Sequence, residues 1–308
     1  MRKLHLTFIA FLMLISAHAQ YGITKKRKPE AELIKTLPLL VVLHDYDDPL
    51  YQRMKADLKE AMQKYWHYSD EIIFVSKDEL REYDKDETKR DKYAYLMFSE
   101  RLYQANVPAG CFCIGLLNKK TFTHFKKFGN YGEKLTMADY KQGLYWLQKD
   151  LETVFSFSKI KENGQNAIEI FKENIKVNTL LLDKDLVTDE LIENIGENYN
   201  YNYSIVSKEE IDQAIMEGRR NVMYLKPFYL INRPIVKTSR STDFTQSNPT
   251  GLGQPLIKIN ETQTTKVSSF TLNNVYRAED NNLLAMFKAN AKDKTTLKQF
   301  KKVMKVLK

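Results

Sequence analysis

A six-residue motif occurs twice in this chain and constrains its fold more than any other feature. "VSKDEL" at 75–80 is matched by "VSKEEI" at 206–211, with four identical positions and two conservative exchanges. In each copy a Ser follows an apolar run and a Glu stands three residues later, which is the capping-box pattern of a helix N-terminus. We therefore interpret the motif as a strand followed by a helix, built twice, in which Lys77 and Lys208 are exposed.

The similarity of the two halves extends beyond the motif on both sides. Apolar runs that end in Asp-x-Asp precede it, and a segment containing Tyr-Leu follows it. The segments that correspond in order are 92–98 and 221–228, 109–125 and 253–270, and the helical patterns 137–155 and 281–307. We expect an α/β fold of two tandem related domains, 28–158 and 163–308, each with a mixed sheet and the order β-α-β-α-β-β-β-α.

The second half contains an additional segment, 237–255, with the sequence "KTSRSTDFTQSNPTGLGQP". Ser, Thr, Gly and Pro make up most of it, and this composition is typical of a surface loop. We therefore expect an exposed loop at this place in the second domain.

The N-terminus has the pattern of a secretory signal peptide. A basic start is followed by an apolar run from Leu6 to Ile15, and small residues at Ala17 and Ala19 mark a cleavage site. The apolar run is too short for a permanent membrane anchor. We expect residues 1–19 to be removed and the mature chain, without a transmembrane segment, to be periplasmic or secreted by a bacterium.

The charge of the chain bears on its partners. Its net charge of +9 is spread over 48 basic and 39 acidic residues. Proteins that bind nucleic acid more often concentrate Lys and Arg in one region. We therefore expect no nucleic-acid partner, and instead another envelope protein or a glycan.

Two Asp-x-Asp pairs are the candidate metal ligands. Asp45 and Asp47, and in the second half Asp183 and Asp185, follow the first predicted strand, at the sheet edge where α/β proteins bind ligands. The pattern resembles the first motif of haloacid-dehalogenase-type phosphatases, and that resemblance implies a nucleophilic first Asp and bound magnesium. The chain lacks the later Gly-Asp-x-x-x-Asp segment of that family. A divalent ion without catalysis is a second interpretation, and we favour a third, ordinary helix capping and solvated strand ends.

A tyrosine-rich segment is the candidate binding surface. "NYNYNYS" at 198–204 places Tyr199, Tyr201 and Tyr203 on one face of an extended chain. Exposed tyrosines in a row stack on sugars or on the aromatic side chains of a partner. The competing interpretation is the entry of a strand with one half-buried face.

Two cysteines lie close together in "GCFCIGLL". Cys111 and Cys113 are two positions apart in a predicted strand, where a disulfide between them would be strained. We interpret them as small apolar residues of a buried strand. A redox pair and a metal pair are the alternatives.

The order of elements resembles a thioredoxin-type domain, most clearly in the first half. A strand leads through an acidic turn to a long helix, and a Pro-bearing loop, "NVPAG", precedes a hairpin and a last helix. That family carries Cys-x-x-Cys where this chain has "DDPL" at 47–50 and "LVTD" at 186–189. The resemblance therefore implies two redox-inactive domains, because thiol exchange has no nucleophile there.

The chain is also similar to exported bacterial proteins with duplicated "VS-(K or R)-E-E-I" modules, a resemblance that implies no particular activity. We expect an exported, non-catalytic protein without a cofactor, acting in binding or in envelope assembly. A metal-dependent Asp-x-Asp hydrolase is the alternative.

Overall fold

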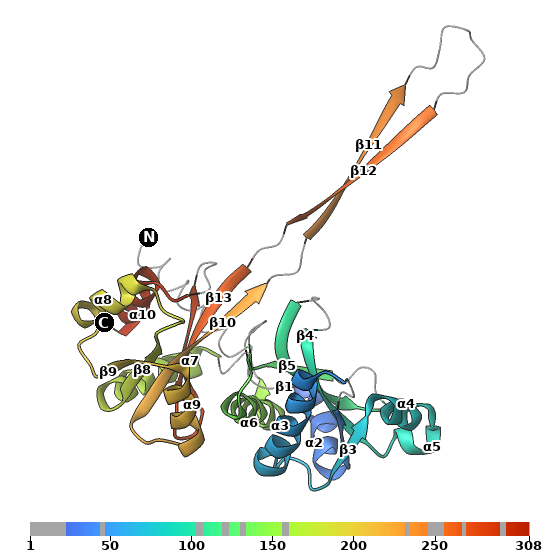
Figure 1. Ribbon diagram of the computed structural model, residues 1–308, viewed down its shortest axis with the longest axis horizontal. Coiled ribbons are helices and arrows are strands. Elements are labelled where there is room, and N and C mark those ends of the chain that lie inside the picture. Colours follow the sequence, from blue (N-terminus) through green and yellow to red (C-terminus); the bar gives the residue numbers. More distant parts are fainter. Residues whose placement is uncertain are drawn as a thin grey trace.

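The structure is a computed structural model with two five-stranded mixed sheets, one in each half of the chain (Figure 1). It describes residues 23–43, 47–102, 107–118, 123–129, 134–155, 160–231, 235–245, 256–266, 269–289 and 294–307. The expected signal peptide, 1–19, lies outside these residues. The predicted α/β class with two sheets is confirmed.

The first sheet has the strand order β3-β2-β4-β5-β6. Its interior strand β2 (Leu39–Leu43) is apolar throughout and lies parallel to β3 (Ile72–Ser76) and to β4 (Ala94–Leu102). β5 (Val107–Leu116) and β6 (Thr123–Lys127) follow antiparallel. All five side chains of β2 are buried, as expected for a parallel strand covered on both faces.

The second sheet has the order β14-β13-β10-β8-β9, which repeats the arrangement of the first. Its strand β8 (Thr179–Asp183) lies parallel to β9 (Tyr203–Val206) and to β10 (Val222–Ile231). β13 (Ser269–Arg277) and β14 (Leu283–Ala289) follow antiparallel. The two halves therefore share strand order and strand direction.

The pairing register also agrees between the two sheets at the segments that correspond in sequence. The matched pairs are Leu40–Tyr95 and Val42–Val75 in the first sheet, and Leu181–Tyr224 and Asp183–Val206 in the second. In this register Asp183 occupies the place of Val42 and not that of Asp45. The expected equivalence of the two Asp-x-Asp pairs is therefore wrong by three positions.

Nine α-helices connect and cover the described strands. In the first half they are α2 (Lys28–Thr36), α3 (Pro49–Tyr65), α4 (Lys77–Lys85), α5 (Glu87–Arg90) and α6 (Met137–Glu152). In the second half they are α7 (Ile160–Val177), α8 (Asp189–Asn198), α9 (Lys208–Glu217) and α10 (Leu297–Leu307). A short parallel pair, β1 (Ile23–Thr24) with β7 (Val154–Phe155), joins the start of the described chain to the end of α6.

The repeated motif caps α4 and α9 as predicted. The Ser76 side chain accepts a hydrogen bond from Glu79 N at 3.1 Å, and the Ser207 side chain accepts one from Glu210 N at 3.3 Å. Each Glu side chain accepts in return from the backbone N–H of its Ser, which completes both capping boxes. The interpretation of the motif as duplicated architecture is confirmed at the level of local structure.

The predicted helical segment 281–307 is wrong in its first part. Residues 283–289 form strand β14, and the helix begins only at Leu297. A short apolar run such as "LLAMFKA" suits a strand or a helix equally well by its sequence alone. Pairing with β13 decides the outcome here.

The first part of the expected loop, 237–245, is instead a strand of a long hairpin. β11 (Ile235–Thr245) and β12 (Leu256–Lys266) pair antiparallel over eleven residues each, and residues 246–255 lie outside the described ones. Figure 1 shows this ribbon projecting away from both sheets. Its Thr, Ile and Val residues favour extended backbone, and this preference outweighs the loop-like composition. The counterpart of β5 is therefore β13, and the expected correspondence of 253–270 with 109–125 is wrong.

One of the three clusters of buried apolar side chains includes residues of both halves. Leu39 on β2, Trp146 on α6 and Tyr224 on β10 belong to the same cluster of buried side chains. Cys111 and Cys113 are buried in the first half and form no disulfide, as small apolar residues of a strand should be. Among the helices that the structure describes, none combines the length and the apolar character that a bilayer crossing requires.

Candidate functional site

Helix α6 forms the joint between the two halves. Lys141 donates a hydrogen bond to Ile215 O at 2.9 Å, and Trp146 Nε1 donates one to Asn281 O at 3.0 Å. The Trp146 ring stacks on Tyr276 with 4.5 Å between ring centroids. These contacts join one helix of the first domain to α9, β13 and the turn before β14, so the joint combines apolar packing with directed hydrogen bonds.

A buried cluster of charges lies at the N-terminal end of this joint. Asp139, in the first turn of α6, is 1% exposed, and its two carboxylate oxygens face two lysines of the second half. Lys226 Nζ on β10 lies 2.5 Å from Oδ1, and Lys208 Nζ on α9 lies 3.1 Å from Oδ2. Burial raises the pKa of Asp139, but the two ammonium groups overcome that effect and hold the pKa well below its ordinary value.

The cluster continues through Asp212, one turn along α9. Lys208 Nζ also lies 3.1 Å from Asp212 Oδ2, so this lysine bridges two carboxylates. Burial raises the pKa of Asp212, and the nearby charge of Asp139 adds to the rise while Lys208 opposes it. The two carboxylates therefore have opposite pKa shifts although they share one cation.

A chain of hydrogen bonds through neutral side chains extends from the Lys226 ammonium into the core. Lys226 donates to Gln142 Oε1 at 3.0 Å, and Gln142 Nε2 is in short contact with the Tyr224 hydroxyl. Tyr224 donates in turn to Asn281 Oδ1 at 3.2 Å. Burial raises the pKa of Tyr224 well above its ordinary value, so the residue acts as a neutral donor at physiological pH.

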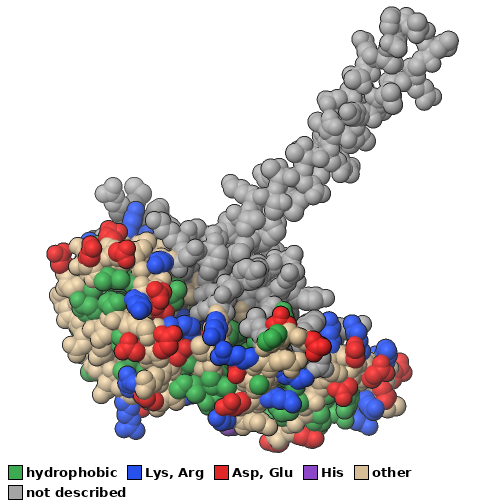
Figure 2. All heavy atoms as spheres, in the orientation of Figure 1, with side chains coloured by type: hydrophobic (Ala, Val, Ile, Leu, Met, Phe, Trp, Pro, Cys, Tyr) green, Lys and Arg blue, Asp and Glu red, His purple; other side chains and the backbone are tan. Residues whose placement is uncertain are grey.

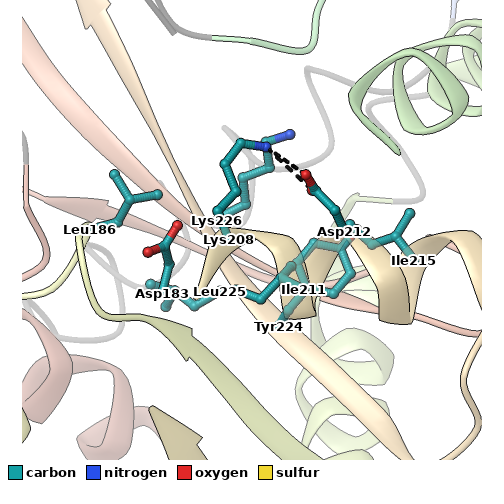
Figure 3. A pocket seen from close by; sticks show the side chains of 9 residues that line it. All are labelled: Asp183, Leu186, Lys208, Ile211, Asp212, Ile215, Tyr224, Leu225 and Lys226. Carbon is teal, nitrogen blue, oxygen red and sulfur yellow. Dashed lines mark hydrogen bonds and ion pairs between the residues drawn. The ribbon is translucent and has the colours of Figure 1, made fainter. Parts of the chain in front are cut away.

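The cluster borders a hollow that is lined by residues of the second half (Figure 3). With its mouth the hollow comprises about 330 Å³, and its interior has room only for water-sized groups. Figure 3 shows Asp183 and Asp212 on opposite sides of the two lysines. The lining residues are Asp183, Leu186, Lys208, Ile211, Asp212, Ile215, Tyr224, Leu225 and Lys226.

Of the predicted metal ligands, the structure brings only Asp183 into this hollow. Asp183 is buried, and its Oδ1 accepts a hydrogen bond from Asp185 N at 2.9 Å, while the Asp185 side chain is exposed. Asp47 is exposed ahead of α3, and Asp45 lies outside the described residues. Within the described part of the chain, His, Cys, Asp and Glu side chains form no group of three or more that would hold a metal ion.

The three predicted binding tyrosines do not form a uniform exposed row. Tyr199 is buried at the end of α8, with its ring 5.7 Å from that of Phe300 on α10. Tyr201 and Tyr203 are exposed and present their rings edge-on to Tyr199. Burial also raises the pKa of Tyr199. The segment thus anchors α8 to α10 and leaves two tyrosines at the surface.

The charged cluster was missed in the sequence. Lys208 belongs to the repeated motif and was expected to be exposed like Lys77, yet it is 27% exposed and binds two carboxylates, whereas Lys77 is exposed. Lys226 is the one feature of the sequence that indicates the cluster, because it is a single charge inside the apolar strand "VMYLKPF". A buried cation of this kind requires a carboxylate partner.

A second buried carboxylate lies within the first half. Asp150 on α6 accepts from Lys126 Nζ at 3.1 Å and lies 2.8 Å from His124 Nε2, both on β6. Burial lowers the pKa of Lys126, and the Asp150 charge opposes that shift. The arrangement fastens the edge strand β6 to α6.

Comparison of the chain with known protein families, with curated proteins and with solved structures found no match.

Proposed function

We propose that the protein is an exported, non-catalytic binding protein that takes part in assembly through its projecting hairpin. We call the two strands of this hairpin, β11 (Ile235–Thr245) and β12 (Leu256–Lys266), the arm. The observation that supports this function best is the open backbone of the arm. β11 and β12 pair with each other and with no other strand that the structure describes, so both outer edges carry backbone N–H and C=O groups without a strand partner.

An arm of this kind favours strand addition. At about 3.3 Å per residue its eleven-residue strands extend roughly 35 Å. A two-stranded ribbon is marginally stable in water without a third strand or a packed face. Proteins usually shorten, bend or cover such edges, and an edge left long and open is a template for another strand. A partner strand therefore completes the arm.

The charged cluster at the joint supports a structural role for the rest of the molecule. Asp139, Lys226, Lys208 and Asp212 neutralise one another across the contact of α6 with α9 and β10. On the face shown in Figure 2, basic and acidic side chains are interspersed over both halves. The domains thus form a base that carries the arm.

Removal of the arm tests this function. Ile231 and Ser269 are the last paired residues of β10 and β13, so an Asn-Gly turn placed between them closes the hairpin without the arm. Cross-linking in the cells that produce the protein, followed by purification, compares the complete and the armless chains. We expect the complete chain to capture a partner that the armless chain loses, with the body equally stable in both. Equal capture by both chains contradicts the proposal.

Two further measurements test the remaining parts of the proposal. Export predicts that the mature chain begins at Gln20, which N-terminal sequencing of the secreted or periplasmic protein determines directly. Magnesium-dependent hydrolysis of a phosphate ester, lost in Asp183→Asn, would contradict the absence of catalysis.

A further inference from the structure

The five central residues of β11 read the same in both directions about Arg240. Residues 238–242 are Thr-Ser-Arg-Ser-Thr, and the oppositely charged Lys237 and Asp243 flank them. When a strand pairs antiparallel with a second copy of itself, each residue meets its mirror position across the two-fold axis. Centred on Arg240, this pairing sets Thr opposite Thr, Ser opposite Ser, and Lys237 opposite Asp243 at two symmetric places.

The geometry of an antiparallel ladder restricts such self-pairing. Opposed pairs alternate between hydrogen-bonded and non-hydrogen-bonded types along the ladder, and symmetry requires mirror pairs to be of the same type. Two residues of one strand therefore oppose each other across the axis only when an even number of positions separates them. Lys237 and Asp243, six positions apart, meet this condition.

The charged residues on the β12 edge of the arm do not meet this condition. On β12, Lys258 and Glu261 are three positions apart, and Glu261 and Lys266 are five apart. Neither pair of opposite charges can face its mirror image in a regular symmetric ladder. Charge complementarity therefore selects the β11 edge over the β12 edge.

Resting on the proposed function of the arm, we propose that its partner is the arm of a second copy of this chain. The two β11 strands pair antiparallel about Arg240 and form a four-stranded sheet in the order β12-β11-β11-β12. Each Arg240 then lies opposite its own copy on one side, a like-charge pair that costs stability, and opposite Glu261 of its own β12 on the other, which offsets that charge. Addition of the second ribbon supplies the strands that a two-stranded arm lacks.

Charge reversal at Lys237 tests the register. Within the arm Lys237 is opposite Thr264, so Lys237→Asp creates no like-charge pair in its own ribbon. Asp243 is opposite Lys258, so a charge reversal at Asp243 would create such a pair within the arm itself. In the dimer the substitution turns both symmetric attractions into repulsions. We expect a dissociation constant raised about tenfold or more. Lys266→Asp, opposite Ile235 on the other edge, is the matched control and should leave the constant unchanged.

The assay is sedimentation equilibrium of the full chain between about 1 and about 200 µM. A dimer weakened by Lys237→Asp and not by Lys266→Asp supports the proposal. A protein that stays monomeric throughout this range overturns it, as does a dimer that both variants weaken equally. If cross-linking in cells still shows an arm-dependent capture of a different protein, the proposed function stands and the second copy is excluded as the partner.

A cysteine on the symmetry axis gives an independent readout. Arg240→Cys places two thiols on directly opposed residues, whose Cα atoms lie about 4.5 to 5.5 Å apart, within the range of a disulfide. Ser241→Cys is the control, because its mirror residue is Ser239 and its own copies lie about 8 Å apart. We expect oxidation to cross-link Arg240→Cys into a covalent dimer and to leave Ser241→Cys uncoupled. If both variants cross-link equally, or if neither cross-links, the proposed register is contradicted.

Discussion

The substitution Asp139→Asn tests whether the charged cluster holds the two halves together. Asn keeps an oxygen for the Thr136 N–H, which Asp139 Oδ2 accepts at 2.9 Å, so the cap of α6 survives. The charge that faces Lys226 and Lys208 is lost. Any effect then reports the ion pairs of the joint and not the start of the helix.

The size of the effect follows from burial. Removing one partner of a buried ion pair costs about 3–5 kcal/mol, because the other charge stays buried without compensation. Lys226, whose side chain is 10% exposed, keeps its hydrogen bond to Gln142 Oε1 and its place over the Trp146 and Phe228 rings. Lys208 is more exposed and keeps Asp212. The lower limit therefore applies, and we expect a loss of about 3 kcal/mol in the free energy of unfolding.

Urea unfolding followed by far-ultraviolet circular dichroism and by tryptophan fluorescence measures this loss, since Trp146 lies in the joint. Replacing both partners, as Asp139→Asn with Lys226→Met, should cost less than the sum of the single changes. The exposed pair Lys64–Glu60 supplies the control, in which Lys64→Met leaves stability unchanged. A loss below about 1 kcal/mol in Asp139→Asn, or strict additivity in the double variant, would refute the reasoning.

Three further predictions follow from the same structure. The pKa of Asp139 lies below its ordinary 3.8, so its contribution is complete above that pH and is lost as the pH falls further, and acid unfolding should flatten in Asp139→Asn. Burial raises the pKa of Cys113 to about 11, so neither it nor the buried Cys111 should react with a thiol reagent at neutral pH until denaturant unfolds the chain. Ser76→Ala and Ser207→Ala should each lower the free energy of urea unfolding by about 1 kcal/mol, and no change in either would exclude the caps.

The local parts of the fold could be predicted from the sequence because their causes are local. A Ser and a Glu three residues apart suffice for a capping box, and the five apolar residues of β2 indicate a buried strand. The arm was missed because its Ser and Thr residues are shared by loops and by exposed strands. Only the backbone hydrogen-bond pairing between β11 and β12 shows that the segment is an exposed strand and not a loop.

The candidate site could not be predicted because its residues meet only in the folded chain. Asp139 and Lys226 are 87 positions apart, and their contact depends on how α6 packs against the second sheet. The two lysines of the repeated motif, Lys77 and Lys208, also show that local sequence does not determine such contacts. Their sequence context is nearly identical, yet α9 faces the other half of the molecule and α4 does not.

Hydrogen exchange of the β11 amides tests the central claim, strand addition at the arm, most directly. In a free ribbon, every second amide of β11 bonds to β12 and is protected, while the amides between them face water. Addition of a strand protects both sets. We predict slow exchange at consecutive residues from Lys237 to Asp243 in the assembled protein, and fast exchange at every second one in Lys237→Asp. Fast exchange at alternate amides in the assembled protein itself would contradict the account.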